Sequence, residues 1–371
     1  MLEYKLKIVE FDREDSSVRD FLRLPGKLYK KNFATQNISV ERALLSGEHI
    51  LLKYFKIHKF VAYYQRRTVA RWILTEYPAC NGLFIGFFEC ADPKGCEDDI
   101  AKGIFEYIES YAAENRFTML AGPLDCSFWI GYRMKLNNFD RAPYFGETYQ
   151  RDYYPELFQK NGFRVAELYE THGFRIREMK NDVFGDYKRK FEARQQEFLQ
   201  SGYTIRKSSK QTLRTDLESI YDMVSVLYNK FPFYHGIEKA DFIANFLPLQ
   251  KIADLSMIRI AFYQYAPVGF IIGLPDHGNI QSRRHGLTLA DYVRVLRNRR
   301  RARRYVMLYM GVLPAHQGLG KAIMNDIYDD IAEKNADIIG AFNKEGRKAN
   351  EYGKGFMDTR YEYGMFVKQV G

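Results

Sequence analysis

The sequence predicts an α/β chain in which two consecutive halves fold as α+β layers, each around a mixed, mostly antiparallel sheet flanked by helices. Three observations predict it. Short apolar runs alternate with stretches of helical periodicity along the whole chain. Segments with the pattern of hairpins occur beside helices that connect two strands, so antiparallel and parallel pairing coexist. The same order of elements occurs twice within 371 residues, a length beyond the roughly 250–300 residues at which one core stops growing.

In the first half, the most regular signal is a helix over Glu97–Glu114, where isoleucines recur every four residues from Ile100 to Ile108. The nearly continuous apolar run Leu83–Cys90 precedes it and is typical of a strand buried on both faces. The other elements predicted here are strands over Lys5–Phe11, Phe117–Ala121 and from Gly162 onward, a hairpin over Phe60–Leu74, and helices over Val18–Tyr29, Val40–Leu45 and Tyr154–Lys160.

The second half repeats this order, with its clearest helix over Leu319–Lys334. The other predicted elements are strands over Tyr203–Lys207, Tyr305–Leu313, Ile338–Phe342 and from Gly355 to Val367, a hairpin over Met257–Gly273, and helices over Leu213–Asn229, Lys239–Phe246 and Arg347–Lys354. The charged segment Asp186–Gln200 predicts a linking helix. We therefore expect an N-terminal domain of residues 1–185, a linker of residues 186–200 and a C-terminal domain of residues 201–371.

The sequence contains no apolar run near the roughly 20 residues that a membrane-spanning helix needs, and its first residues lack the apolar core of a secretion signal. The cysteines show no metal-ligand spacing, and without an export signal we expect them to be reduced. They are Cys80, Cys90, Cys96 and Cys126. We expect a cytoplasmic protein with no metal and no membrane partner.

The net charge of +10 is concentrated in the run Arg294–Arg304, where seven of eleven residues are arginine. Such a run suits nucleic acid, an anionic substrate or a cofactor phosphate. It is equally typical of a solvated basic helix. Because it lies shortly before a predicted buried strand, we expect it to fold back near the mouth of the active site.

The stretch Arg304–Ala322 carries the most chemistry. A buried strand ends at Pro314, and a glycine-rich turn leads directly into an amphipathic helix. The unpaired N–H groups at the start of a helix, together with the positive end of its dipole, suit a pyrophosphate. Gly318 and Gly320 let phosphate oxygens approach the main chain without a Cβ in the way.

Three phosphate-binding motifs compete for this turn. The P-loop pattern needs a glycine and a hydroxyl where the chain has Ala315 and Ala322, which removes the magnesium ligand. The dinucleotide fingerprint meets Ile323 where a third small residue belongs. The third pattern, Q/R-x-x-G-x-G/A, matches Gln317–Ala322 at every specified position. It resembles the pyrophosphate loop of the GNAT superfamily of acyl-CoA N-acyltransferases.

Further segments extend the resemblance to tandem GNAT-like two-domain bacterial proteins, which are similar in build to N-myristoyltransferases and Fem-type transferases. The segments are FLRLPGKLYKK, GLFIGFFE, GPLDCSFW, YYPELFQKNGF, GFIIGLPDHGN and YMGVLPAHQGLG. The resemblance implies direct transfer of an acyl group, here expected to be acetyl, from acetyl-CoA to an amine acceptor, a small molecule or a peptide. The implied cofactor-binding residues are Met310, Val312, Leu313, Gln317, Gly318, Leu319, Gly320, Lys321, Ala322 and Asn343.

The resemblance also implies catalytic groups. Backbone N–H groups near Val312 and Leu313 would polarise the thioester carbonyl. Tyr352 would be the general acid, although it lies three residues before Gly355 where the family's tyrosine lies four before the glycine. His235 and Asp276 are candidates for the general base, and a relay through ordered water is the alternative.

We expect one coenzyme site per chain. The equivalent turn of the first half, Asp92–Asp99, has one glycine and four carboxylates. Carboxylates at a helix N-terminus already satisfy the dipole and would repel a pyrophosphate. We expect this half to shape the substrate site or to serve as a scaffold.

Two other functions remain open. A Fem-type transferase that uses aminoacyl-tRNA would explain the two-domain build and the Arg294–Arg304 run, with nucleic acid as the partner. A non-catalytic module that only binds acyl-CoA would keep the same turn.

Overall fold

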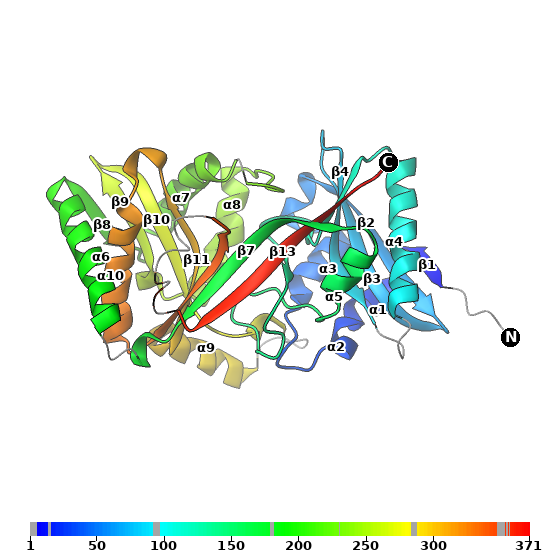
Figure 1. Cartoon of the computed structure of the whole chain (residues 1–371), viewed down its shortest axis with the longest axis horizontal. Helices are drawn as coiled ribbons and strands as arrows, with labels where there is room; N and C mark the ends of the chain where they lie inside the picture. The colour runs from blue at the N-terminus through cyan, green and yellow to red at the C-terminus, as the bar shows by residue number, and fades with distance from the viewer. Residues whose placement is uncertain are drawn as a thin grey trace.

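The computed structural model of the protein describes residues 6–13, 16–91, 97–178, 182–229, 231–282, 288–346, 353, 355 and 357–371. In these residues thirteen strands form one continuous sheet, flanked by helices on both faces (Figure 1). Two neighbouring pairs, β4–β5 and β11–β12, are parallel, and the others are antiparallel. The predicted α/β layers around a mixed, mostly antiparallel sheet are confirmed, with the sheets of the two halves joined into one.

The strand order is β1-β2-β3-β4-β5-β13-β7-β12-β11-β10-β9-β8, and β6 pairs with β13 off this path. The strands are β1 (Lys7–Glu10), β2 (Lys56–Tyr64), β3 (Arg67–Glu76), β4 (Gly82–Cys90), β5 (Met119–Gly122), β6 (Met134–Lys135), β7 (Arg164–Phe174), β8 (Tyr203–Lys207), β9 (Ile258–Tyr263), β10 (Ala266–Pro275), β11 (Arg304–Val312), β12 (Asp337–Lys344) and β13 (Thr359–Gln369).

The two halves exchange strands at the centre of the sheet. The C-terminal strand β13 pairs with β5 of the first half, while β7 of the first half pairs with β12 of the second. β7 and β13 also pair with each other along almost their whole length, and Figure 1 shows this long ribbon crossing between the halves. Each half therefore completes its sheet with a strand of the other. The predicted limits of the two domains, at residues 185 and 201, stay predictions, because strands from both sides of these limits pair with each other.

The helices cover the sheet in three hydrophobic clusters. They are α1 (Ser17–Arg23), α2 (Pro25–Leu28), α3 (Ile38–Ser46), α4 (Glu97–Glu114), α5 (Tyr154–Lys160), α6 (Asp182–Gln200), α7 (Leu213–Leu227), α8 (Lys239–Phe246), α9 (Leu289–Arg301) and α10 (Leu319–Glu333). One cluster packs α4 and α5 on the first half, and another packs α6 and α10 on the second. The apolar face of α10 that its periodicity predicted is fully buried.

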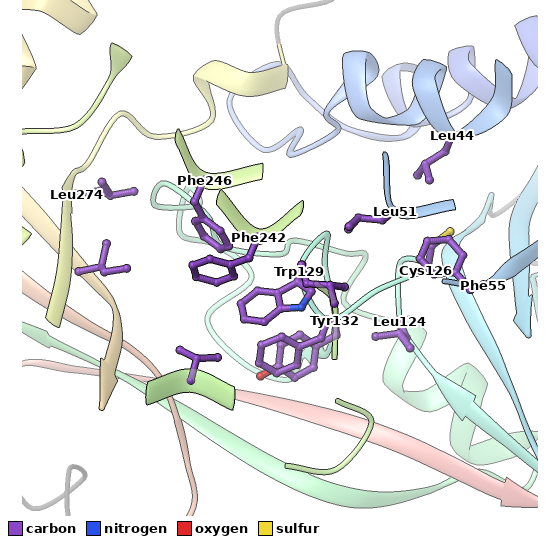
Figure 2. Close-up of a cluster of buried hydrophobic side chains, with 14 of the residues drawn as sticks. Leu44, Leu51, Phe55, Leu124, Cys126, Trp129, Tyr132, Phe242, Phe246 and Leu274 are labelled. Atoms are coloured by element: carbon purple, nitrogen blue, oxygen red, sulfur yellow. The ribbon is translucent and has the colours of Figure 1, made fainter. Parts of the chain in front are cut away.

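The third cluster joins the two halves. It contains side chains of α1 and α3 from the first half and of α7 and α8 from the second. In its middle, Trp129 and Tyr132 from the connection after β5 lie beside Phe242 and Phe246 of α8 (Figure 2). Trp129 meets both phenylalanine rings edge-on, with ring centroids 5.4 and 5.6 Å apart. An interface of this kind packs like the interior of a single domain.

Most predicted elements appear within two or three residues of their expected ends. The helix predicted over Val18–Tyr29 is instead two, because Pro25 begins a new helix at a position where its missing N–H costs no hydrogen bond. The predicted helix Arg347–Lys354 lies almost entirely outside the described residues.

Replacing Phe366 of β13 by alanine should loosen the first half of the chain. Its ring is fully buried among side chains of α4 and α5, 5.6 Å from that of Phe158. Losing a buried phenylalanine ring costs about 3–5 kcal/mol. Hydrogen exchange measured by mass spectrometry should show reduced protection in β5 and α5.

The matched control is Ile331→Ala in α10, which should reduce protection in α6 and α10 instead. Loss of protection confined to residues after 200 in the Phe366→Ala variant would contradict the strand exchange.

Candidate functional site

A cleft opens in the second half where β11 and β12 diverge. The two strands pair in parallel only from Arg304–Asp337 to Met307–Gly340. Directly beyond, β11 has a bulge at Leu308, and β12 shifts register against β7 between Gly340 and Asn343. Bulges bend strands and end their pairing. The two bulges therefore separate the strands, and a cavity of about 600 Å³ lies between them.

Six of the ten residues predicted to bind the cofactor line this cavity. They are Met310, Val312, Gln317, Gly318, Gly320 and Asn343. Its volume lies in the range of small-molecule pockets. One wall is aromatic and comes from the residues that directly follow α7, with Tyr228 and Phe231. The structure thus brings strand, turn and Asn343 together at one cleft, as the resemblance implies.

Backbone groups of β11 face the cleft at alternate positions. Leu313 donates its N–H to the carbonyl of Val268, 2.9 Å away, which fixes the pairing of this strand end with β10. In an antiparallel ladder, hydrogen-bonded and non-hydrogen-bonded residues alternate. Met310 and Val312 therefore point their N–H groups away from β10, toward the side that β12 has left.

The expectation that the N–H of Leu313 polarises the thioester carbonyl is corrected, because this N–H already donates to the carbonyl of Val268. The donors available for a thioester carbonyl are those of Met310 and Val312. The side chain of Leu313 instead packs against the shared core of the two halves.

The glycine-rich turn ends in a helix start that leaves main-chain donors unpaired. Gly318 is the N-cap of α10 and has φ +95°, a conformation that suits glycine. No side chain caps this end of the helix, and its first turn contains no acidic residue. The N–H groups of Leu319 and Gly320 are therefore free to meet an anion.

Three residues of the predicted turn do not line the cavity. The side chains of Leu319 and Ala322 are fully buried in the core under α10, so only their backbone can contribute to a site. Lys321 is exposed to solvent. His316, beside the turn, hydrogen-bonds the hydroxyl of Tyr203 at 2.8 Å.

An arginine that the sequence did not single out lies on the turn. Arg194 of α6 places its Nη2 3.4 Å from the carbonyl oxygen of Gln317. A Cβ at position 318 would clash with this guanidinium, which packs directly against the glycine. Its side chain is about one-third exposed and also pairs with Glu197. A cation thus stands beside the free N–H groups of α10, at the point where a pyrophosphate would lie.

Two of the three predicted catalytic residues, Asp276 and His235, do not line this cleft. Asp276 accepts hydrogen bonds from the N–H groups of Phe145 and Gly278 and pairs with Arg304, so its carboxylate serves the structure at the start of β11. His235 stacks on Tyr77 of the first half, with ring centroids 3.5 Å apart. Burial lowers the pKa of His235, but it does not line the cleft. Tyr352 lies outside the described residues.

A different histidine does line the cleft. His172 of β7 is buried, and its Nε2 lies 2.8 Å from a carboxylate oxygen of Glu170. It reaches the second half only through the strand exchange. No local signal in the sequence could have placed it there.

The first half has a cleft that also forms where two parallel strands separate, but its lining is acidic. β4 and β5 pair only from Gly82–Met119 to Phe84–Ala121, and β4 then shifts register against β3, with Phe87 at φ +49°. The cavity beyond measures about 380 Å³. Its lining includes four carboxylates, those of Glu41, Glu89, Asp125 and Glu147, beside the single guanidinium of Arg71.

Two of these carboxylates are paired with a cation, Glu41 with Arg71 and Glu147 with the buried amine of Lys135. Arg71 holds Glu41 through two bonds of 2.6 and 3.1 Å, and lies 4.0 Å from Glu89. Glu89 accepts hydrogen bonds from two tyrosine hydroxyls, those of Tyr29 and Tyr154. Burial raises the pKa of Glu89 to about 7 and that of Asp125 to about 6. A second pyrophosphate would meet like charge here.

The helix that follows the cleft in the first half also begins with acidic residues, unlike α10. α4 begins at Glu97, so Glu97, Asp98 and Asp99 occupy its first turn, whereas the first turn of α10 has no acid. The turn before it, residues 92–96, lies outside the described residues.

The arginine-rich run lies away from the cleft. α9 precedes the first residue of β11, whereas the glycine-rich turn follows its last, and in Figure 1 α9 occupies the lower edge of the second half. No described residue of the run lines either cavity. The expectation that the run borders the active-site mouth is therefore corrected.

The described residues contain no group of three or more His, Cys, Asp or Glu side chains arranged to hold a metal ion. In the same part of the chain, no helix is both long and apolar enough to cross a membrane.

By sequence, no protein-family model and no curated protein matches the chain. By structure, it is similar to a tandem GNAT protein from the clavulanic acid biosynthesis pathway over 99% of both chains, with a TM-score of 0.54 and 10% identity. It is also similar to a GCN5-related glucosamine N-acetyltransferase region of a fungal multi-domain GH3 β-N-acetylglucosaminidase, with a TM-score of 0.53 and 11% identity, over 99% of this chain and 38% of that one.

A third similar structure is a conserved protein of unknown function from Enterococcus faecalis V583, with a TM-score of 0.51 and 8% identity, over 99% of this chain and 72% of that one. At these identities the likeness concerns the fold. The chain has the tandem GNAT fold, as its motifs predicted.

Replacing Glu89 by glutamine should flatten the pH dependence of stability. The folded-state pKa of about 7 lies above the ordinary value of 4.5, so the folded chain holds a proton that the unfolded chain has lost between these values. The stability that this proton confers is complete below about pH 4.5 and is lost as the pH rises through about 7. At about 1.4 kcal/mol per pH unit, the total loss between these two pKa values is about 3.5 kcal/mol.

Urea unfolding at pH 5 and pH 8 measures this difference, and glutamine keeps an acceptor for the two tyrosines. The matched control is Glu106→Gln on α4, an exposed position. An equal pH dependence in wild type and Glu89→Gln would show that Glu89 is ionised throughout.

Proposed function

We propose that the protein is an acyl-CoA-dependent N-acyltransferase whose coenzyme lies in the cleft between β11 and β12. The observation that carries the proposal is that three features able to bind amides or anions follow one another along the cleft. Free backbone groups of Met310 and Val312 lead to the Gly318 turn, and Arg194 stands beside that turn. A pantetheine arm needs amide partners, and a pyrophosphate needs N–H groups and cations.

The residues present fit such a ligand. Gly318 lets the guanidinium of Arg194 lie against the helix start, and Leu319 and Gly320 offer their N–H groups to an anion there. Gln317 and Asn343 place amide side chains on the cavity wall. When bound, the coenzyme would supply the activated acyl thioester.

The chain's own contribution to transfer is then binding and polarisation. The N–H groups of Met310 and Val312 can hydrogen-bond a carbonyl that enters between the strands, and each such donor stabilises the charge that develops on its oxygen. Tyr228 and Phe231 exclude water from one wall of the cleft. His172, held by Glu170, is the described histidine placed to accept a proton from an attacking amine, directly or through water.

We propose acetyl as the acyl group and a small-molecule or peptide amine as the acceptor. The N-acetyltransferase region among the similar structures supports acetyl in general terms. Neither follows from the fold.

Thiol release tests this proposal. With acetyl-CoA and a panel of amines, the wild-type chain should release coenzyme A, detected with a thiol reagent. Arg194→Ala should raise the Michaelis constant for acetyl-CoA about tenfold, because a hydrogen bond to a charged group contributes roughly 1.5 kcal/mol or more. Turnover at saturation should change little, since Arg194 contacts the turn and not the reacting atoms.

The matched control is Arg189→Ala on the same helix, where the guanidinium is exposed and pairs with Asp186. It should leave the Michaelis constant unchanged. Acetyl-CoA binding without thiol release for any amine would favour a non-catalytic module. Equal constants for both variants would remove the turn from the coenzyme site.

A further inference from the structure

Helix α9 presents an apolar stripe to solvent. Four of its residues, three or four positions apart, lie on one face, and their exposed fractions are large for apolar side chains. They are Leu289 (81%), Tyr292 (55%), Val293 (59%) and Leu296 (58%). Among the described residues only two other large hydrophobic side chains, Val226 (55%) and Tyr265 (99%), are as exposed, and they lie elsewhere in the chain. A clustered stripe of this kind marks an interaction surface.

Arginines flank this stripe. Arg294, Arg297 and Arg301 follow one another at spacings of three and four residues, so they line one side of the apolar face. All three are exposed, and no carboxylate of the described residues lies within ion-pair distance of them. Asp291, the acid on this helix, is buried in the capping box with Thr288. The outer surface of α9 is therefore apolar and basic.

The body of the protein holds α9 in this orientation. Val295 is buried in the shared core, and Arg299 donates to the carbonyl of Ala253 at 3.1 Å. The capping box of Thr288 and Asp291 closes the first turn of the helix. Because these contacts fix the buried side, the apolar stripe and its arginines face solvent.

We propose that α9 docks the protein on an anionic lipid surface, with Leu289, Tyr292, Val293 and Leu296 inserted at the interface and the arginines among the headgroups. A helix with one apolar face, arginines beside it and few acids is the kind that lies in the plane of such a surface. At 1.5 Å per residue, α9 is about 20 Å long and runs along the surface without spanning it. A nucleic acid would neutralise the arginines but would leave the apolar stripe in water.

This proposal is independent of the acyltransferase proposal, because α9 lies at the opposite end of β11 from the glycine-rich turn. It revises the expectation of no membrane partner, which rested on the lack of a spanning segment.

Vesicle flotation tests the docking. The full chain should float with vesicles of phosphatidylglycerol and phosphatidylcholine and not with phosphatidylcholine alone, and salt should release it. Val293→Asp should weaken binding at least tenfold. Arg297→Gln should weaken it about fivefold, the effect of about 1 kcal/mol for one cation at an anionic surface.

Two matched controls make the same kinds of substitution at exposed positions outside α9. Val226→Asp on α7 changes a valine of similar exposure (55%), and Arg189→Gln on α6 removes an exposed arginine. Both should bind as wild type does. All four positions are exposed, so the melting temperatures of the variants should equal that of the wild type.

Three results would overturn the proposal. They are equal binding to neutral vesicles, equal losses in the control variants, and no vesicle binding by a chain that sediments as a dimer and becomes monomeric on Val293→Asp. The last result would assign the stripe to a second copy of the chain.

Discussion

The pairing of β7 with β12 is the constraint on which the cleft depends. β12 leaves β11 after Gly340, yet its backbone groups still need partners. β7 supplies them, because Asn343 and Lys344 pair with Glu170 and Tyr169. The cleft thus stays open because β12 is held from its other edge. That edge comes from the first half of the chain, so the site is built by both halves even though its turn and strand belong to one.

The two halves share this geometry and differ in charge. In each, a parallel pair separates next to a bulged strand and a cavity forms in the gap. In the second half the gap leads to an uncapped helix start with an arginine beside it. In the first half the gap is lined by the carboxylates of Glu41, Glu89, Asp125 and Glu147 and by one arginine. Buried carboxylates with raised pKa values repel a pyrophosphate whenever they ionise, and they cost stability when they do. The same backbone therefore offers one coenzyme site.

Local patterns in the sequence predict elements well and long-range partners poorly. The ends of α4, α5, α8 and β8 agree with the predicted ranges, because each has a clear period and clear end signals. The turn at Gly318 was likewise visible, since glycine spacing and an adjoining helix are local features. The strand exchange was not, because periodicity shows which face of a strand is apolar and not which strand lies beside it. His172 reaches the cleft only through such a distant pairing, and Arg194 reaches the turn only through the packing of α6 on α10. The hydrogen bonds and the ion pair that hold Asp276 are also tertiary, so the sequence could not show them.

Calorimetric titration of coenzyme A into the whole chain tests the central claim most directly. If charge restricts the coenzyme to the cleft between β11 and β12, the titration gives one site per chain, and the Gln317→Glu substitution, which brings a carboxylate to the turn, greatly weakens it. Two equivalent sites would contradict the exclusion of the acidic cleft. Absence of binding, or full binding by Gln317→Glu, would contradict the assignment of the cleft itself.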